Sequence, residues 1–310
     1  MRTRIWIRLA LLVAGLPCQQ VAAQTQQAQA EAPEAQQTFA SVAEATNALL
    51  QAVKAHDTGE VRRIFGPEVT NLMTGDVKQD EANFDSFARH LAEGCSAVQD
   101  GAGKFTLQIG APPWPFPIPL VQSNSVWMFD TAAGEEEIIN RHIGKDEFYA
   151  IGACHAYVRA QQNYASRNDG VYARRFLSEP GKSDGLCAAV GGFPNNFDDA
   201  CVESRSSSNR PKPFHGYWFK ILTRQGPAAS GGPMHYIHRG RMTGGFALVA
   251  FPVRWGESGV MTFIVNQDGR IYERSLGEKT ARIGFAMKEF NPGPAWNLVQ
   301  DPGITDLGNP

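Results

Sequence analysis

The sequence predicts an α+β protein with two units, residues 39–121 and residues 122–296. Three observations lead to this prediction. Apolar residues repeat at helical spacing through the first third and the middle of the chain. Short runs of β-branched and aromatic residues follow from residue 215 onwards. Between them, residues 112–119 contain five prolines, which restrict the backbone and donate no hydrogen bonds, so this segment should be extended.

The N-terminal unit is predicted to begin with helices. Ser41 and Glu44 form a capping box at the start of the first helix. A second helix should run from Thr58 to the Gly-Pro pair at 66–67, and Asp80 is the expected N-cap of a third. Alternating apolar residues at 105–109 then predict a half-buried strand.

The second unit is predicted to combine a long helix with an antiparallel meander. After a strand at 126–129, the pattern indicates a helix over about 132–165, whose later half turns one apolar face to the sheet. The remaining expectations are strands at 217–222, 235–239, 246–251 and 260–265, a hairpin turn at 266–269, a helix at 279–290 and a frayed tail at 297–310.

The N-terminus resembles a secretory signal. Three arginines precede a short apolar run, and Val21-Ala22-Ala23 supplies small residues for cleavage after Ala23, so residues 1–23 are the expected signal peptide. The Gln- and Ala-rich residues 24–38 should form a disordered tether. We therefore expect a periplasmic or secreted protein.

Charge and hydropathy argue against nucleic acid as a partner and against a membrane span. The chain has 29 Lys and Arg against 31 Asp and Glu, so it lacks the basic footprint of a nucleic-acid-binding protein. No later stretch is apolar and long enough to span a bilayer. Neither nucleic acid binding nor membrane spanning is expected, and no motif indicates a cofactor.

Four cysteines remain after cleavage, and they allow three full disulfide connectivities. A bridge between Cys187 and Cys201 is favoured, because both lie in one irregular segment that a crosslink would stabilise. Cys154 lies on the apolar face of the long helix. It is either a small core residue or the partner of Cys95.

The densest ionisable cluster surrounds Glu137. Arg141 is four residues later, so the two can pair on one helix face, and the adjacent Ile138 and Ile139 suggest that this pair is buried against the meander. Glu137 and Glu147 are also candidates for paired carboxylates in general acid–base catalysis. A solvated helix end is the commoner meaning of such a cluster.

Two other motifs give weaker indications of a functional site. His235 and His238 are three residues apart in a predicted strand, where they face opposite sides, so no metal site is expected. The segment around Ser258 lacks the glycine spacing of a nucleophile elbow and leads into a strand.

Several longer motifs resemble a bacterial secreted family, domain-of-unknown-function family 2950. They are Trp114–Val121, Phe129–Gly134, His215–Tyr217, Gln225–Pro227, Gly244–Ala250 and Ser258–Asn266. The resemblance covers residues 39–296 and implies an envelope protein without an established activity. It makes Arg141, His215 and Gln225 candidate binding residues. His142 and Asp146 depart from the family's usual Arg and Asn.

Two weaker resemblances concern the fold. Residues 43–66 are similar to the helical start of cystatin-like cone domains, and residues 146–276 resemble the globular part of type IV pilin-like proteins. Fold likeness does not transfer function. The sequence favours a non-enzymatic envelope module that binds another protein or a cell-wall component. The alternative is a cell-wall or polysaccharide hydrolase that uses Glu137 and Glu147.

Overall fold

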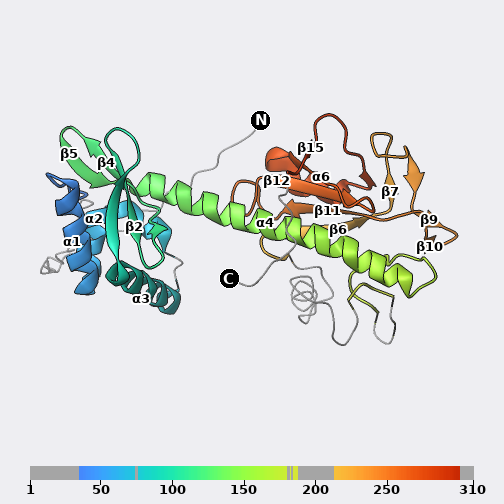
Figure 1. Cartoon of the computed structure of the whole chain (residues 1–310), viewed down its shortest axis with the longest axis horizontal. Helices are drawn as coiled ribbons and strands as arrows, with labels where there is room; N and C mark the ends of the chain where they lie inside the picture. Colours follow the sequence, from blue (N-terminus) through green and yellow to red (C-terminus); the bar gives the residue numbers. More distant parts are fainter. Residues whose placement is uncertain (1–34, 74–75, 180–181, 183, 188–212, 301–310) are drawn as a thin grey trace, which may run out of the picture.

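The computed structural model describes residues 35–73, 76–179, 182, 184–187 and 213–300. The chain has an α+β fold, as predicted, with two separate hydrophobic cores. One core is built from residues before 130 and the other from residues after 149. A single long helix, α4 (Thr131–Ser166), runs between the two units (Figure 1).

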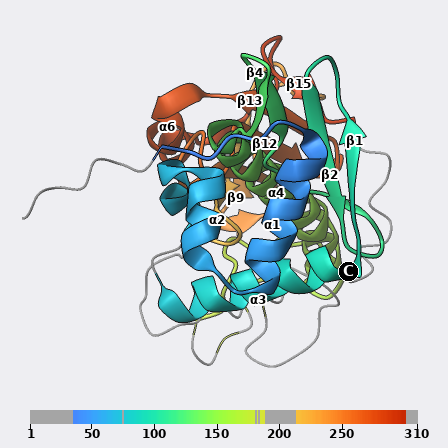
Figure 2. The same ribbon diagram turned by 90° about the vertical axis from the view of Figure 1, so that its left-hand side faces the viewer.

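Helices form one side of the N-terminal unit, and they face the viewer in Figure 2: α1 (Val42–Lys54), α2 (Thr58–Phe65), the 3-10 helix η1 (Pro67–Leu72) and α3 (Val77–Glu93). The predicted capping box is present, since the Ser41 Oγ accepts the Glu44 N–H at 3.2 Å. The predicted cap of α3 was wrong. Asp76, which accepts the N–H groups of Lys78 and Gln79, precedes the helix, and Asp80 lies inside it.

The N-terminal sheet is antiparallel, with strand order β1-β2-β4-β5. Its strands are β1 (Cys95–Gln99), β2 (Lys104–Ile109), β4 (Leu120–Ser123) and β5 (Val126–Phe129), and the two-residue β3 (Trp114–Pro115) pairs with the end of β2. The proline-rich segment is extended only in part, because it begins in a turn over 110–113 and bends at 117–118 after β3. Its Phe116 and Ile118 side chains lie in the core. The unit boundary expected after residue 121 falls within β4.

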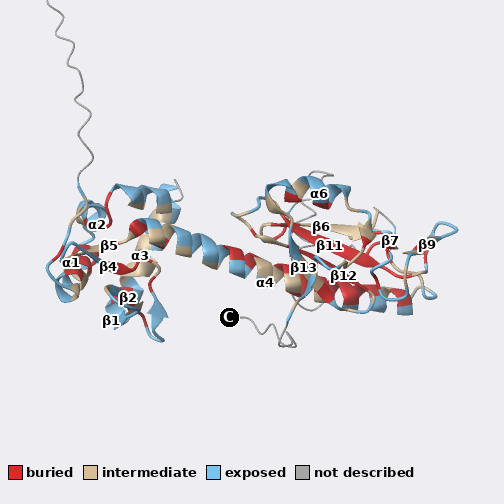
Figure 3. Ribbon diagram, turned by 90° about the horizontal axis from the view of Figure 1, so that it is seen from above, coloured by how far each residue is buried: buried red, intermediate tan, exposed pale blue. Residues whose placement is uncertain are grey.

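Helix α4 is 36 residues long, about 54 Å at the usual rise per residue. At its start the Thr131 hydroxyl donates to the Phe65 carbonyl at 2.6 Å, which attaches the helix to the N-terminal unit. Towards its end the Tyr157 hydroxyl donates to the Ala247 carbonyl at 3.2 Å. Its middle is largely exposed (Figure 3). The apolar face predicted for the later half of the helix is therefore not buried at Phe148, which is exposed.

The C-terminal sheet is an antiparallel meander with strand order β15-β13-β12-β11-β6. Its strands are β6 (Tyr217–Leu222), β11 (Ala247–Pro252), β12 (Met261–Asn266), β13 (Ile271–Ser275) and β15 (Asn297–Leu298). The central strand β11 is buried along its whole length, because the sheet lies between α4 and α6 (Thr280–Ala286) (Figure 1).

Smaller elements complete this unit: β7 (Arg224–Gln225), β8 (Met234–His235), β9 (Ile237–His238), β10 (Arg241–Met242), the 3-10 helix η2 (Gly277–Lys279) and β14 (Glu289–Phe290). The strand predicted at 235–239 is divided between β8 and β9. The helix predicted at 279–290 ends at Ala286, because Met287 is extended at φ −62° and ψ 131° and Phe290 pairs in parallel with Gln225.

Parts of both predicted flexible ends are ordered. Within the expected tether, the Gln36 Nε2 donates to the carbonyls of Ile64 at 3.0 Å and Phe129 at 2.6 Å. Within the expected tail, β15 pairs with β13. The predicted signal peptide lies outside the described residues. None of the helices that the structure describes is long and apolar enough to cross a membrane.

Cys95 and Cys154 are free thiols, so the alternative of a bridge between them was wrong. Cys154 is a core residue of the C-terminal unit, and burial raises the pKa of its thiol. Cys187 is buried, but Cys201 lies outside the described residues. The Cys187–Cys201 bridge therefore stays a prediction, which non-reducing peptide mapping would test.

Candidate functional site

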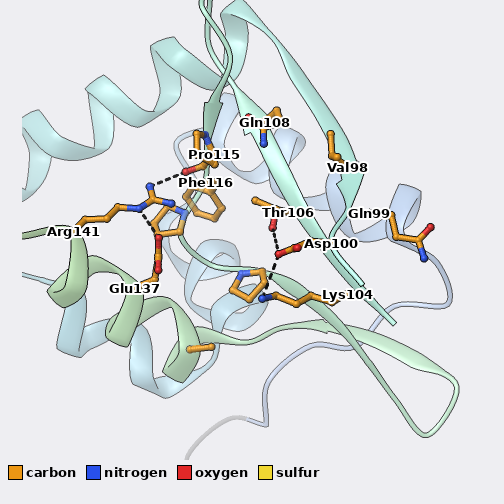
Figure 4. Close-up of a pocket in the computed structure, with 13 residues that line it drawn as sticks. Val98, Gln99, Asp100, Lys104, Thr106, Gln108, Pro115, Phe116, Glu137 and Arg141 are labelled. Atoms are coloured by element: carbon orange, nitrogen blue, oxygen red, sulfur yellow. Dashed lines mark hydrogen bonds and ion pairs between the residues drawn. The ribbon is translucent and has the colours of Figure 1, made fainter. Parts of the chain in front are cut away.

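A hollow of about 490 Å³ opens on the N-terminal unit, and we call it the Arg141 hollow. Its walls are β1, β2, the proline-rich segment and the first turns of α4 (Figure 4). Arg141 and Glu137 project from α4 on one side, and Lys104, Thr106 and Gln108 project from β2 on the other. Three consecutive parts of the sequence, between Val98 and Arg141, thus surround one cavity.

Arg141 is held by three contacts. Its Nε donates to the Glu137 Oε1 at 2.7 Å, its Nη1 donates to the Pro115 carbonyl at 2.8 Å, and its guanidinium carbon lies 5.0 Å from the ring centroid of Trp114. Such a cation–π contact orients the guanidinium and the ring together. The Trp114 residue is nevertheless 46% exposed, so the pair presents a broad flat surface to solvent.

The predicted Glu137–Arg141 ion pair is confirmed, but its predicted burial against the meander was wrong. The two side chains are 45% and 33% exposed. They lie on the portion of α4 that passes the N-terminal unit, where Arg141 contacts the proline-rich segment, whereas the contacts of α4 with the meander begin further along the helix.

The opposite wall is also polar and balanced in charge. The Lys104 Nζ lies 3.4 Å from the Asp100 Oδ2, and the Thr106 hydroxyl donates to the same oxygen at 3.5 Å. With Arg141 and Glu137, the lining carries two positive and two negative charges. The hollow therefore offers hydrogen-bonding groups and an aromatic face rather than a net charge, which suits a polar ligand.

Glu147 does not face Glu137. Its Oε1 accepts the backbone N–H groups of Val260 at 2.8 Å and Met261 at 2.9 Å, at the start of β12. Ten residues of helix separate Glu137 from Glu147, about 15 Å along the axis. Paired glycosidase carboxylates lie about 5–9.5 Å apart. The hydrolase hypothesis thus loses the facing pair on which it rested.

The neighbourhood of Glu147 is acidic. Asp146 is buried, with its Oδ2 3.3 Å from the His142 Nε2. Burial, and then the charge of Glu147, raise the pKa of the Glu273 carboxyl on β13. Glu147 contributes to structure here, because its charge-assisted bonds satisfy two backbone donors at a strand end.

Gln225 is also a structural residue. Its Nε2 donates to the carbonyls of Ser230 at 2.9 Å and Gly232 at 2.8 Å, and its Oε1 accepts the Tyr236 hydroxyl at 2.9 Å. The residue is 2% exposed. Its amide therefore holds the glycine-rich loop, residues 226–233, in place and is not presented to a ligand.

His215 is exposed and stacks on Tyr149, with ring centroids 4.0 Å apart and an interplanar angle of 15°. The structure does not bring Arg141, His215 and Gln225 together. Arg141 faces the hollow, His215 lies beside the middle of α4, and Gln225 lies beneath the glycine-rich loop. Among the described residues, no group of three or more His, Cys, Asp or Glu is placed to hold a metal ion.

The β2 wall of the hollow was not among the candidate site residues predicted from the sequence. A signal for it exists, because Lys104, Thr106 and Gln108 alternate with the apolar residues of the predicted strand and must share its opposite face. The polar face of this strand can be predicted from the sequence. Its role as one wall of a cavity cannot, because α4 forms the opposite wall and its position depends on the tertiary structure.

The comparisons with known proteins agree with the resemblance seen in the sequence. The model of the family described as "Protein of unknown function (DUF2950)" matches residues 36–299. No curated protein and no solved structure matches the chain, so the cystatin-like and pilin-like resemblances stay predictions. The family match covers most of the chain, and the protein therefore belongs to the DUF2950 family of proteins of unknown function.

Proposed function

We propose that this protein is an exported envelope protein that works as a non-enzymatic binding or assembly module, and that the Arg141 hollow is its contact surface. One observation carries the proposal. The exposed Trp114 ring, stacked with the Arg141 guanidinium, stands beside an open cavity of about 490 Å³. Exposed aromatic and arginine side chains at a cavity are typical of binding surfaces.

The roles of the other candidate residues support the same proposal. Glu147 holds the start of β12, and Gln225 holds the glycine-rich loop. Their polar groups thus serve the fold. The N-terminal unit can contact a ligand through exposed surface and hydrogen-bonding groups, and these suffice for recognition.

The lining indicates the chemistry of the ligand. Because its charges balance, a partner gains little from a net charge and more from hydrogen bonds to Thr106 and Gln108. A partner that extends past Arg141 can also stack on Trp114, which does not line the hollow but lies against that guanidinium. A neutral or weakly charged stretch of an envelope protein and a cell-wall glycan share these properties.

Export is the other part of the proposal, supported by the arginine-rich start and the small residues before position 24. Sequencing the N-terminus of protein recovered from the periplasm should find Gln24 first. A full-length product, or one that carries lipid on Cys18, would contradict this.

Site-specific photo-crosslinking in living cells tests the binding role. A photoreactive amino acid in place of Gln108 should yield a discrete adduct that mass spectrometry can identify as a protein or as cell-wall material. The same amino acid in place of Gln162, which is exposed on α4 far from the hollow, should yield none. Equal labelling from both positions, or no adduct from Gln108, would contradict the proposal.

A further inference from the structure

A second hollow lies on the other side of the proline-rich segment, and we call it the α2–α3 groove. Its volume is about 560 Å³, and α2, η1, α3 and one residue of α4, Ile138, line it. Phe116 and Pro117 line both this groove and the Arg141 hollow, so they form the wall between the two.

The groove is mainly apolar, and its edge exposes large side chains. Phe65, Phe84 and Phe87 line it. Val77 is 71% exposed, and Met73 and Ile138 are also exposed. Three apolar side chains that converge in this way, from the residue that follows η1, from α3 and from α4, are unusual on a free surface, and such patches mark interaction sites.

The edge formed by α3 is acidic. Glu81 and Asp85 are both exposed and four residues apart, and Asp80 lies beside them. Against these three carboxylates the lining offers one guanidinium, that of Arg62, and one imidazole, that of His56. The groove therefore combines an apolar floor with a negative edge.

The folding of α3 does not explain this acidic pair. Like charges at this spacing repel each other on a helix. The helix dipole favours carboxylates within the first turn, and both residues lie beyond it. Within the described residues neither Glu81 nor Asp85 has an ion-pair partner. Their charge is available to a cation from outside.

We propose that the α2–α3 groove binds an amphipathic helical segment of a partner protein, with bulky apolar residues on one face and Lys or Arg beside them. A groove between helices accepts the apolar face of such a segment, and the acidic edge of α3 complements its basic residues. This inference rests on the proposed binding function and names a partner class and a second surface for it.

Two synthetic peptides of about 18 residues, roughly five helical turns, serve as probes. Both carry Leu at helical spacing. All remaining positions are Lys in one peptide and Glu in the other. Fluorescence anisotropy with the mature protein should show the Leu/Lys peptide binding at least about tenfold more tightly than the Leu/Glu peptide. Equal affinities would overturn the proposal.

Charge reversal tests the acidic edge. The Glu81→Lys/Asp85→Lys variant should lose about tenfold or more in affinity for the Leu/Lys peptide. The control Glu136→Lys/Glu278→Lys makes the same change in net charge at two exposed positions that do not line the groove, and it should bind like the wild type. An equal loss in both variants would show attraction to the whole surface and overturn the proposal.

Removal of exposed apolar groups tests the apolar part of the edge. In the Met73→Ser/Val77→Ser variant both changes lie at the surface, so the melting temperature should stay near that of the wild type while peptide affinity falls about tenfold. A fluorescent fatty acid is the second probe. If it binds the wild type and the charge-reversed variant equally while the Leu/Lys peptide binds neither, the groove is a lipid site and the proposal is overturned. The crosslink from Gln108 tests the other hollow, so either result can fail without the other.

Discussion

The carboxylate of Glu147 accepts the backbone N–H of Val260 at 2.8 Å, although 113 residues separate the two in sequence. The same oxygen accepts the N–H of Met261 at 2.9 Å. These bonds fix the middle of α4 to the first residues of β12. They join the exposed middle of α4 to the core of the C-terminal unit.

We predict that Glu147→Ala lowers the free energy of unfolding by about 2–3 kcal/mol, because two backbone donors lose a charged acceptor. Chemical denaturation of the mature protein measures this. The matched control is Glu136→Ala at an exposed position of the same helix, which should change stability by less than about 0.5 kcal/mol. Unchanged stability in Glu147→Ala would contradict a structural role for this residue.

Gln225→Leu should destabilise the protein by at least about 2 kcal/mol, since the buried Tyr236 hydroxyl loses its acceptor and the carbonyls of Ser230 and Gly232 lose their donor. Limited proteolysis should also cut the loop at 226–233 faster. Gln162→Leu, an exposed change of the same type, is the control. If Gln225→Leu folds with wild-type stability, the amide is not what holds the loop.

Two glycines of α4 should respond in opposite directions to alanine. A Cβ on Gly134 would lie 2.5 Å from the Ile118 Cγ1, whereas a Cβ on Gly144 would meet nothing within 4 Å. Gly144→Ala should stabilise by up to about 1 kcal/mol through helix propensity. Gly134→Ala should destabilise by about 1–3 kcal/mol through overpacking. Thermal melting of both variants tests this, and a shift of the same sign in both would contradict the close packing of α4 on Ile118.

Glu273 should make stability depend on pH. Its raised pKa means that the folded state binds the proton more tightly than the unfolded state, so its contribution becomes more favourable as the pH falls through the folded pKa towards the ordinary value. At neutral pH Glu273→Gln should therefore stabilise, by up to about 1 kcal/mol given the partial exposure of the site. Denaturation curves between neutral and mildly acidic pH should show this advantage shrink. An advantage that grows with acidity would contradict the assignment.

Much of the fold could be predicted because its signals are local. The capping box of Ser41 and Glu44 and the apolar periodicity of α4 depend on residues within a few turns of each other. The strand β1 was missed because Cys95–Gln99 contains only one β-branched residue, and its pairing with β2 supplies what its composition lacks. The end of α6 was missed because Phe290 is drawn into a pairing with Gln225, far back in the sequence.

The site was predicted less well, because its parts meet only through tertiary structure. The spacing of Glu137 and Arg141 predicted their ion pair but not Trp114 or Pro115 as neighbours of Arg141. Nothing local to Glu147 indicates that its partners are backbone groups of β12. A carboxylate with such partners looks, in sequence, like one that is poised for catalysis.

If a ligand of the Arg141 hollow also stacks on Trp114, which lies against Arg141, binding should depend on that ring. The most direct test is the yield of the Gln108 photo-crosslinked adduct in Trp114→Ala, measured together with the melting temperature. Because the ring is half exposed, we predict that the adduct falls about tenfold or more while melting shifts by no more than a few degrees. An adduct of wild-type yield in a variant that remains folded would show that Trp114 takes no part in binding.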